Sequence, residues 1–192
     1  MKRLSLYLFL ILLTLPTPSK ADDISDFQIE GMSVGDSLLD YMSKDKIKKI
    51  KSPNKKIKIV RAYKKNNLKI YDIMQSWWFD KDQEYKIVGL SGELFFDNDY
   101  EGCKKKQEEI GKSLVSMFPN LLVRKSDSKY MHDETKKSIT SHYVLKFKSG
   151  DFFDVQCHKF SKNYKKKYPS IVDNLKVMIW SKEFYDHYRA AR

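Results

Sequence analysis

The chain has 192 residues, a mass of 22.8 kDa and a formal charge of +12, from 37 Lys and Arg against 25 Asp and Glu. Its length suits one domain or two very small ones. An apolar fraction of 41% with 14% aromatic residues argues against wholesale disorder, because enough surface can be buried to offset chain entropy. Two cysteines exclude a disulfide-rich scaffold and a four-thiolate zinc site.

Residues 1–21 have the three parts of a secretory signal peptide. Lys2 and Arg3 precede an apolar run of 12 residues, and Ser19-Lys20-Ala21 offers a small-residue cleavage site. A retained membrane anchor is the alternative, but such a run spans only about 18 Å as a helix, less than the ~30 Å hydrocarbon core. We therefore expect a periplasmic or secreted mature chain, residues 22–192, with no transmembrane segment.

The charge of the mature chain is +9 and is carried almost wholly by lysine. The full sequence has 32 Lys and only 5 Arg, together with few Ala, Gly and Pro, which is the codon bias of an AT-rich genome. Arginine, the residue best suited to paired phosphate contacts, is scarce, so we do not expect nucleic-acid binding. An anionic component of the cell envelope, or an unknown protein, is the expected partner.

The two cysteines, Cys103 and Cys157, both lie in the mature chain, and export would place them in oxidising surroundings. We predict that they form a disulfide, which the chain-entropy model values at about 4 kcal/mol for a loop of this length. The alternative is a catalytic thiol assisted by His158. A CxxC motif is absent from the sequence.

The first half of the mature chain predicts short helices followed by three strands. One helix begins after Asp36 or Ser37 and another after Ser43, where these side chains can cap the first turn. Alternating apolar positions then predict strands over residues 57–63, 68–79 and 85–96.

The second half begins with the clearest helix of the sequence. It is capped within residues 97–99, carries apolar side chains in phase with Cys103, and ends at Pro119. The remaining expected elements are a polar loop over 124–141, a hairpin of strands at 141–148 and 152–160, a basic loop over 161–170, a strand at 175–180 and a final helix after Ser181.

Consecutive strands joined by short turns imply antiparallel pairing. We therefore predict a single α+β domain, with a twisted, mainly antiparallel sheet and helices packed on one face. The two halves share a loose order of helix followed by strands, which would fit a degenerate repeat.

The sequence contains no recognisable catalytic or metal-binding motif. Its four histidines, His132, His142, His158 and His187, form neither a metal-spaced pair nor an HExxH motif, and no GxSxG is present. The run 97–99 is explained as a helix cap, and the cluster 132–134 as a solvated turn. We expect no cofactor and no metal, and no catalytic residue can be assigned.

Two segments are candidate binding surfaces. Trp77 and Trp78 are adjacent, so a strand sends them to opposite faces, and one of them can be exposed for stacking on a sugar ring or a partner side chain. The second segment, which mixes cations with aromatic rings, would suit an anionic contact. It consists of Tyr164, Lys165, Lys166, Lys167 and Tyr168.

Residues 27–41, which read FQIEGMSVGDSLLDY, resemble a family of small exported proteins of uncharacterised function from AT-rich bacteria. Gly92 to Phe96, the Cys103 helix and the Cys157 strand fit the same pattern. The GMSVGD start is also similar, more distantly, to the helix–helix–sheet modules of outer-membrane assembly lipoproteins and lactamase-inhibitor proteins, although this chain lacks the lipidated cysteine. Neither resemblance implies catalytic residues.

The sequence favours a non-enzymatic exported protein that binds a partner or supports the envelope. The alternative is an envelope hydrolase acting on cell-wall or polymer substrates, and a carrier of a small apolar ligand is a third possibility. A pocket that holds one of the four histidines beside a carboxylate would favour the hydrolase, whereas histidines scattered over a convex surface would argue against it.

Overall fold

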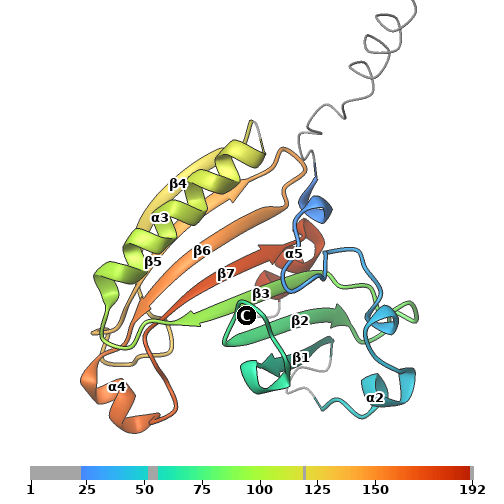
Figure 1. Cartoon of the computed structure of the whole chain (residues 1–192), viewed down its shortest axis with the longest axis horizontal. Coiled ribbons are helices and arrows are strands. Elements are labelled where there is room, and N and C mark those ends of the chain that lie inside the picture. Colours follow the sequence, from blue (N-terminus) through green and yellow to red (C-terminus); the bar gives the residue numbers. More distant parts are fainter. Residues whose placement is uncertain (1–22, 52–55, 119, 191–192) are drawn as a thin grey trace, which may run out of the picture.

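Seven antiparallel strands form one sheet in the order β1-β2-β3-β7-β6-β5-β4 (Figure 1). The computed structural model describes residues 23–51, 56–118 and 120–190, so the predicted signal peptide lies outside the described residues. The strands are β1 (Ile57–Tyr63), β2 (Ile73–Phe79), β3 (Gly89–Phe95), β4 (Leu122–Lys129), β5 (Ile139–Lys146), β6 (Phe152–Lys159) and β7 (Asn174–Trp180).

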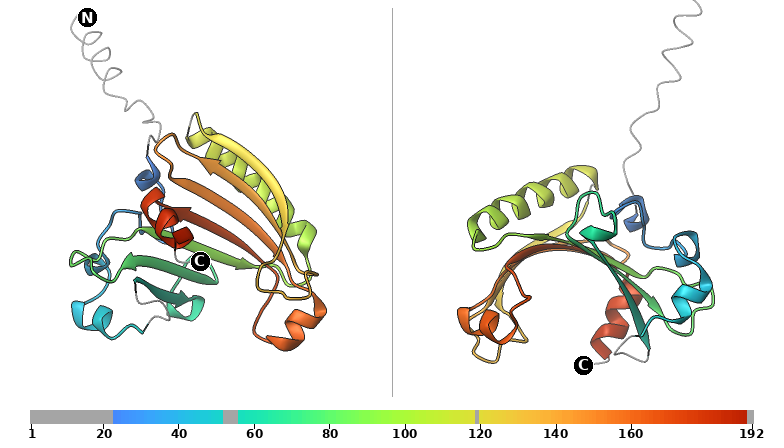
Figure 2. Two further views of the ribbon diagram at one scale, coloured as in Figure 1. Left: turned by 180° about the vertical axis from the view of Figure 1, so that it is seen from behind. Right: turned by 60° about the horizontal axis from the view of Figure 1, so that its bottom comes forward.

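The sheet is strongly arched, with helices at three places around it (Figure 2). The longest helix, α3 (Tyr100–Met117), lies across the convex face, whereas α4 (Lys162–Lys167) and α5 (Lys182–Ala190) lie at opposite ends of the arch below it. A further short helix, α2 (Lys44–Lys48), and 3-10 turns at Ile24–Asp26, Leu38–Asp40 and Lys64–Asn66 complete the fold. The predicted α+β class and the antiparallel sheet are confirmed.

The main core lies on the convex face. Alternate strand residues point to this side, and those of β6 and β7, such as Val155 and Val177, are fully buried there. Helix α3 covers the β5–β7 part of this face with Cys103 and Leu114, and the N-terminal segment covers the rest with residues such as Leu38. The convex face of the sheet, except along β4, is thus occupied by core packing.

Strand β2 begins at Ile73, later than the predicted start at residue 68. The reason is Glu30, whose carboxylate accepts hydrogen bonds from the backbone N–H groups of Lys69, Ile70 and Tyr71 at 2.7–2.9 Å. Partial burial alone would raise the pKa of Glu30, but these three donors lower it below its usual value. The N–H groups of Lys69, Ile70 and Tyr71 therefore bind the Glu30 side chain instead of a neighbouring strand.

Strand β4 occupies the first third of the polar loop predicted over residues 124–141, and for those residues the prediction is wrong. Residues 122–129 pair with β5 along their whole length, from Leu122 opposite Lys146 to Lys129 opposite Ile139. The strand lies at the edge of the sheet, and nearly all of its side chains are exposed on both faces. A strand without a buried face has no apolar alternation, which is why the sequence pattern did not reveal it.

The basic loop predicted over residues 161–170 contains the short helix α4. Ser161 caps it by accepting a hydrogen bond from the Tyr164 N–H at 3.2 Å. The helix is held in place by Tyr164, whose buried ring contacts Tyr130 and Phe160. With three consecutive lysines and only one buried residue, the segment shows no helical apolar stripe.

Candidate functional site

The inside of the arch seen in Figure 2 is the concave face of the sheet. An open groove of about 1250 Å³ lies on this face. Its floor consists of side chains that point away from the main core, at alternate positions of β2, β5, β6 and β7, and its walls come from β1, β4, α5 and the segment after β4. Whereas the convex face is covered by α3 and the N-terminal segment, this face stays accessible over much of its length.

The groove is lined by positive charge. Six cationic side chains line it against one carboxylate, that of Asp154. The cations are Arg61, Arg124, Lys129, Lys146, Lys176 and Arg189. Every arginine in the described part of the chain is among them, although the sequence scatters these residues over β1, β4 and α5.

Two of these arginines are available to a ligand. Arg61 and Arg124 are exposed, and neither forms an ion pair with another of the described residues. Lys176, by contrast, is largely buried and pairs with Glu93 at 2.9 Å, and its ammonium group also lies 5.9 Å from the centre of the Trp77 ring. The guanidinium of Arg189 lies 5.6 Å from the Tyr185 ring centre, which orients it beside the groove.

A serine, a histidine and an aspartate form a hydrogen-bonded chain across three neighbouring strands of the groove. The Oγ of Ser128 on β4 lies 3.0 Å from Nε2 of His142 on β5, and the Nδ1 of that imidazole lies 3.1 Å from Oδ2 of Asp154 on β6. Gln156 donates to the same carboxylate oxygen at 2.6 Å. Sequence reasoning missed this set, because its members are 14 and 12 residues apart and match no motif.

His158 lies beside this chain but is buried. Its Nδ1 is 3.0 Å from the Thr140 hydroxyl, and its ring stacks on Phe160. Burial, with smaller effects from the charges of Lys176 and His142, lowers the pKa of His158 to about 3. This imidazole is therefore neutral over the physiological range.

An aromatic cluster forms one end of the groove, where α5 packs under β1–β3. Phe184 is buried against Trp77 and Trp180, whose ring centres lie 5.7 and 5.0 Å from the centre of the Phe184 ring. Trp77 is half-buried and lines the groove, whereas Trp78 is only 2% exposed and belongs to the convex core. The two adjacent tryptophans therefore do lie on opposite faces, and only Trp77 reaches the candidate site.

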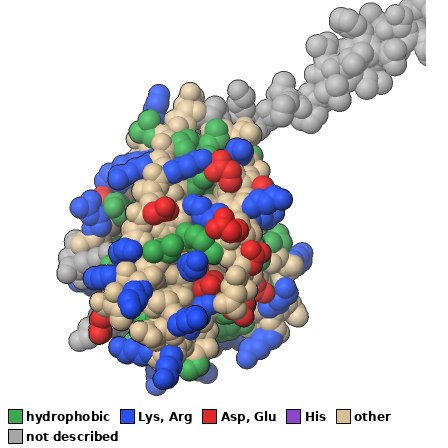
Figure 3. All heavy atoms as spheres, turned by 90° about the vertical axis from the view of Figure 1, so that its left-hand side faces the viewer, with side chains coloured by type: hydrophobic (Ala, Val, Ile, Leu, Met, Phe, Trp, Pro, Cys, Tyr) green, Lys and Arg blue, Asp and Glu red, His purple; other side chains and the backbone are tan. Residues whose placement is uncertain are grey.

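The Tyr164–Tyr168 segment lies outside the groove lining. Tyr164 is buried, and Lys165 is engaged with Asp173 at 3.0 Å and Asp97 at 3.7 Å. Lys167 pairs with Glu134, and its ammonium also lies over the Tyr168 ring, while Lys166 is exposed. Figure 3 shows one side of the molecule, where Lys and Arg are spread among acidic and polar side chains.

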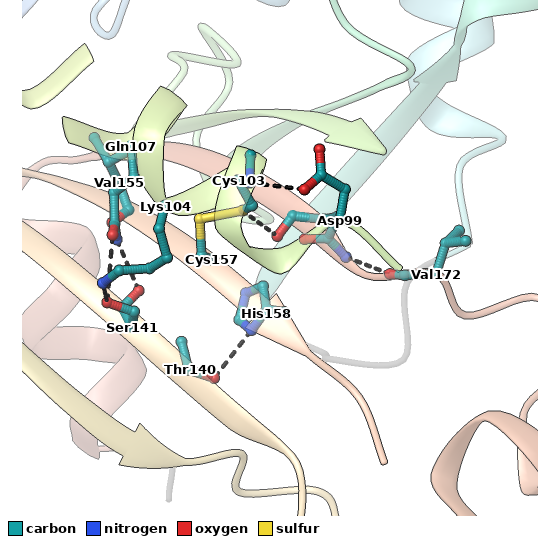
Figure 4. Close-up of a disulfide and its surroundings, with 12 residues drawn as sticks. Asp99, Cys103, Lys104, Gln107, Thr140, Ser141, Val155, Cys157, His158 and Val172 are labelled. Carbon is teal, nitrogen blue, oxygen red and sulfur yellow. Dashed lines mark hydrogen bonds between the residues drawn. A yellow bond between two sulfur atoms is a disulfide. The ribbon is translucent and has the colours of Figure 1, made fainter. Parts of the chain in front are cut away.

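The predicted disulfide between Cys103 and Cys157 is confirmed. It joins α3 to β6 within the core, with the two Cα atoms 6.0 Å apart (Figure 4). Next to it, the Gln107 side chain donates to the carbonyl oxygens of Ser141 and Val155. The alternative of a catalytic thiol is wrong, since both cysteines are cross-linked.

Asp133 is a structural group rather than part of a solvated turn. It is 2% exposed and accepts hydrogen bonds from the backbone and hydroxyl groups of Thr135 and Ser138 and from the Ser161 hydroxyl. These donors, foremost the Ser138 hydroxyl, lower the pKa of its carboxyl well below the usual range. No cluster of three or more potential metal ligands occurs among the described residues.

Comparisons with protein-family models, curated proteins and solved structures found no match for the chain. Within the part of the chain that the structure describes, no helix is long and apolar enough to cross a membrane. The fold and the groove therefore define the chain as an α+β protein with one covered face and one open, cationic concave face.

Proposed function

We propose that this is an exported protein that binds an anionic polymer of the cell envelope in its concave groove. The observation that carries the proposal is the convergence of six cationic residues on a surface lined by a single carboxylate, with only Lys176 of the six in an ion pair among the described residues, to Glu93. That carboxylate, on Asp154, is largely buried and hydrogen-bonded to His142 and Gln156, so the exposed charges of the groove are positive. Arg61 and Arg124, which form no ion pair with the described residues, supply planar donor groups suited to phosphate or carboxylate.

The shape of the site favours a polymer chain over a membrane surface. A flat lipid headgroup layer cannot follow the inside of an arch, whereas an extended chain can lie along it (Figure 2). The half-buried rings of Trp77 and Trp180 line the same groove and can contact sugar units of such a polymer. A glycan with phosphate or carboxylate groups thus matches both the charge and the aromatic lining.

An exported location agrees with the cross-link. Disulfides persist in oxidising compartments and are rare in the reducing cytosol. The Cys103–Cys157 bond therefore supports export, together with the signal peptide expected over residues 1–21.

Binding is best tested with the mature chain, residues 22–192, and a phosphodiester-linked glycan such as purified teichoic acid. We expect saturable binding that weakens as salt is raised, because exposed charges are screened. Replacing both unpaired arginines (Arg61→Gln with Arg124→Gln) should weaken binding at least about tenfold, the equivalent of losing roughly one charge-assisted hydrogen bond.

A matched control removes the same charge elsewhere. Lys48→Gln with Lys105→Gln changes two exposed lysines on α2 and α3, outside the groove lining. It should leave the affinity almost unchanged. Equal losses from both double variants, or equal binding of neutral dextran and teichoic acid, would contradict a specific cationic groove. Preferential binding to anionic vesicles would contradict the proposal and identify a lipid surface as the ligand of the cationic residues.

A further inference from the structure

We propose that Ser128, His142 and Asp154 constitute a hydrolytic site that cleaves carboxylic esters in the concave groove. Ser128 is the nucleophile, His142 the general base and acid, and Asp154 the positioning residue. Ester cleavage by these three residues does not require that the groove binds anions. A preference for esters on an anionic polymer, however, rests on the function proposed above.

The protonation states follow from the hydrogen bonds. A carboxylate can only accept, so the contact between Asp154 and Nδ1 of His142 at 3.1 Å places the imidazole proton on Nδ1. Nε2 is then an acceptor, and the hydroxyl of Ser128, 3.0 Å away, donates to it. This is the arrangement in which a histidine can take the proton of an attacking serine.

Exposure increases from the carboxylate to the nucleophile. The side chain of Asp154 is 10% exposed and that of His142 is 22% exposed, whereas Ser128 is exposed. The carboxylate is thus shielded and further held by Gln156, while the hydroxyl is open to a substrate in the groove. All three residues lie on paired strands, which form a rigid support.

The reaction balances with water as the only co-reactant. The Ser128 oxygen attacks the ester carbonyl carbon while its proton passes to Nε2 of His142. The tetrahedral intermediate then expels the alcohol, which takes that proton, and leaves an acyl group on Ser128. Water attacks this acyl group with His142 as the base, which releases the carboxylic acid and returns the proton to Ser128.

The edge position of β4 supplies a donor for the developing oxyanion. Backbone N–H groups of an antiparallel strand point alternately toward and away from the partner strand. Because the Tyr130 N–H bonds to the Ser138 carbonyl on the β5 side, the N–H of Lys129, the residue after Ser128, points to the outer edge. Among the described residues no strand pairs with that edge, so this N–H is open to a substrate oxygen.

The first experiment uses a fluorophosphonate probe, whose phosphorus is attacked by an activated serine with loss of fluoride. The mature chain should gain one adduct, mapped to Ser128 by peptide mass spectrometry. Ser128→Ala should abolish the adduct, and His142→Asn should reduce its rate at least about 100-fold. Ser116→Ala, which changes an exposed serine on α3 outside the groove lining, should label at the wild-type rate.

A second measurement follows hydrolysis of p-nitrophenyl acetate. Asp154→Asn should lower kcat with little change in KM or in thermal stability, because it disturbs the orientation of His142 without touching the substrate. Absence of any adduct in the wild-type chain, or an adduct that persists in Ser128→Ala, would overturn the proposal. Teichoic acid binding by Ser128→Ala distinguishes polymer binding from ester hydrolysis, since this variant should still bind the polymer but should not cleave esters.

Discussion

At the residue scale, buried polar groups dictate how the fold responds to pH. His158 is 7% exposed and is satisfied by the Thr140 hydroxyl without carrying a charge. Its neighbour in sequence, Cys157, points into the opposite core, so the strand separates a disulfide from an imidazole by a single peptide unit. The sequence shows that the two side chains diverge, but only the packing shows that both are buried.

Acidification should destabilise the protein through His158. Its pKa is about 3 in the fold and 6.5 in the unfolded chain, so between these values only the unfolded state binds the proton. The stability contribution is fully present above pH 6.5 and is lost as the pH falls. Urea unfolding at pH 7 and pH 5 should differ by about 2 kcal/mol from this group.

The variant His158→Gln keeps a hydrogen-bonding side chain but cannot titrate, so most of that pH dependence should disappear. His187→Gln is the matched control, because His187 is exposed on α5 and should leave the dependence intact. An unchanged pH dependence in His158→Gln would show that other groups govern acid unfolding.

The candidate catalytic residues show the limit of reading single residues from sequence. Ser128 is one of several polar residues in a stretch that was predicted to be a loop, and His142 and Asp154 are isolated members of separate strands. Only the pairing of β4 with β5 and of β5 with β6 places them in one row. An alternation of polar side chains along the predicted 141–148 and 152–160 strands was the one signal of a second, solvent-facing surface.

At the element scale, α3 is the part of the fold that the sequence predicted best. Its cap at Asp99, its end before Pro119 and its buried stripe through Cys103 and Leu114 follow from local patterns. Gly111, by contrast, is explained only by the sheet beneath. A Cβ atom at this position would lie 2.5 Å from the Tyr143 ring, so this ring of β5 packs directly against the helix backbone.

Gly111→Ala should therefore destabilise the protein by about 1–3 kcal/mol, although alanine is the better helix former, because overpacking outweighs propensity. Chemical unfolding measures the loss. The double variant Gly111→Ala with Tyr143→Leu should lose less than the sum of the two single variants, since the smaller side chain relieves the clash. Strict additivity would contradict the direct contact.

The disulfide ties this helix to β6 and should contribute much of the stability. Cys103→Ala with Cys157→Ala should lower the free energy of unfolding by about 3–4 kcal/mol, as expected for a loop with a sequence separation of 54 residues. Unfolding curves with and without reductant provide the measurement. Reductant should destabilise the natural protein and leave the double variant unaffected, and an equal response of both would contradict this assignment.

At the scale of the whole molecule, the arch of the sheet creates two surfaces of different kinds. The convex side is a continuous apolar core under α3 and the N-terminal segment, and the concave side is a cationic groove with aromatic side chains at one end. The low arginine count in the sequence argued against nucleic-acid binding, yet all the described arginines meet on this one surface. Composition measures how many such residues exist, but recognition depends on where they converge.

The sequence by itself determined the α+β class, the helix around Cys103, the antiparallel strands with a buried face and the pairing of the two cysteines. These features depend on local periodicity, on capping residues and on cysteine count, which a linear pattern records. The tertiary structure alone decided the edge strand β4, the arch, the arginine-lined groove and the Ser128–His142–Asp154 chain. Those features come from how the strands pair and how the sheet curves, and exposed polar residues carry no periodic signal of which partner they will meet.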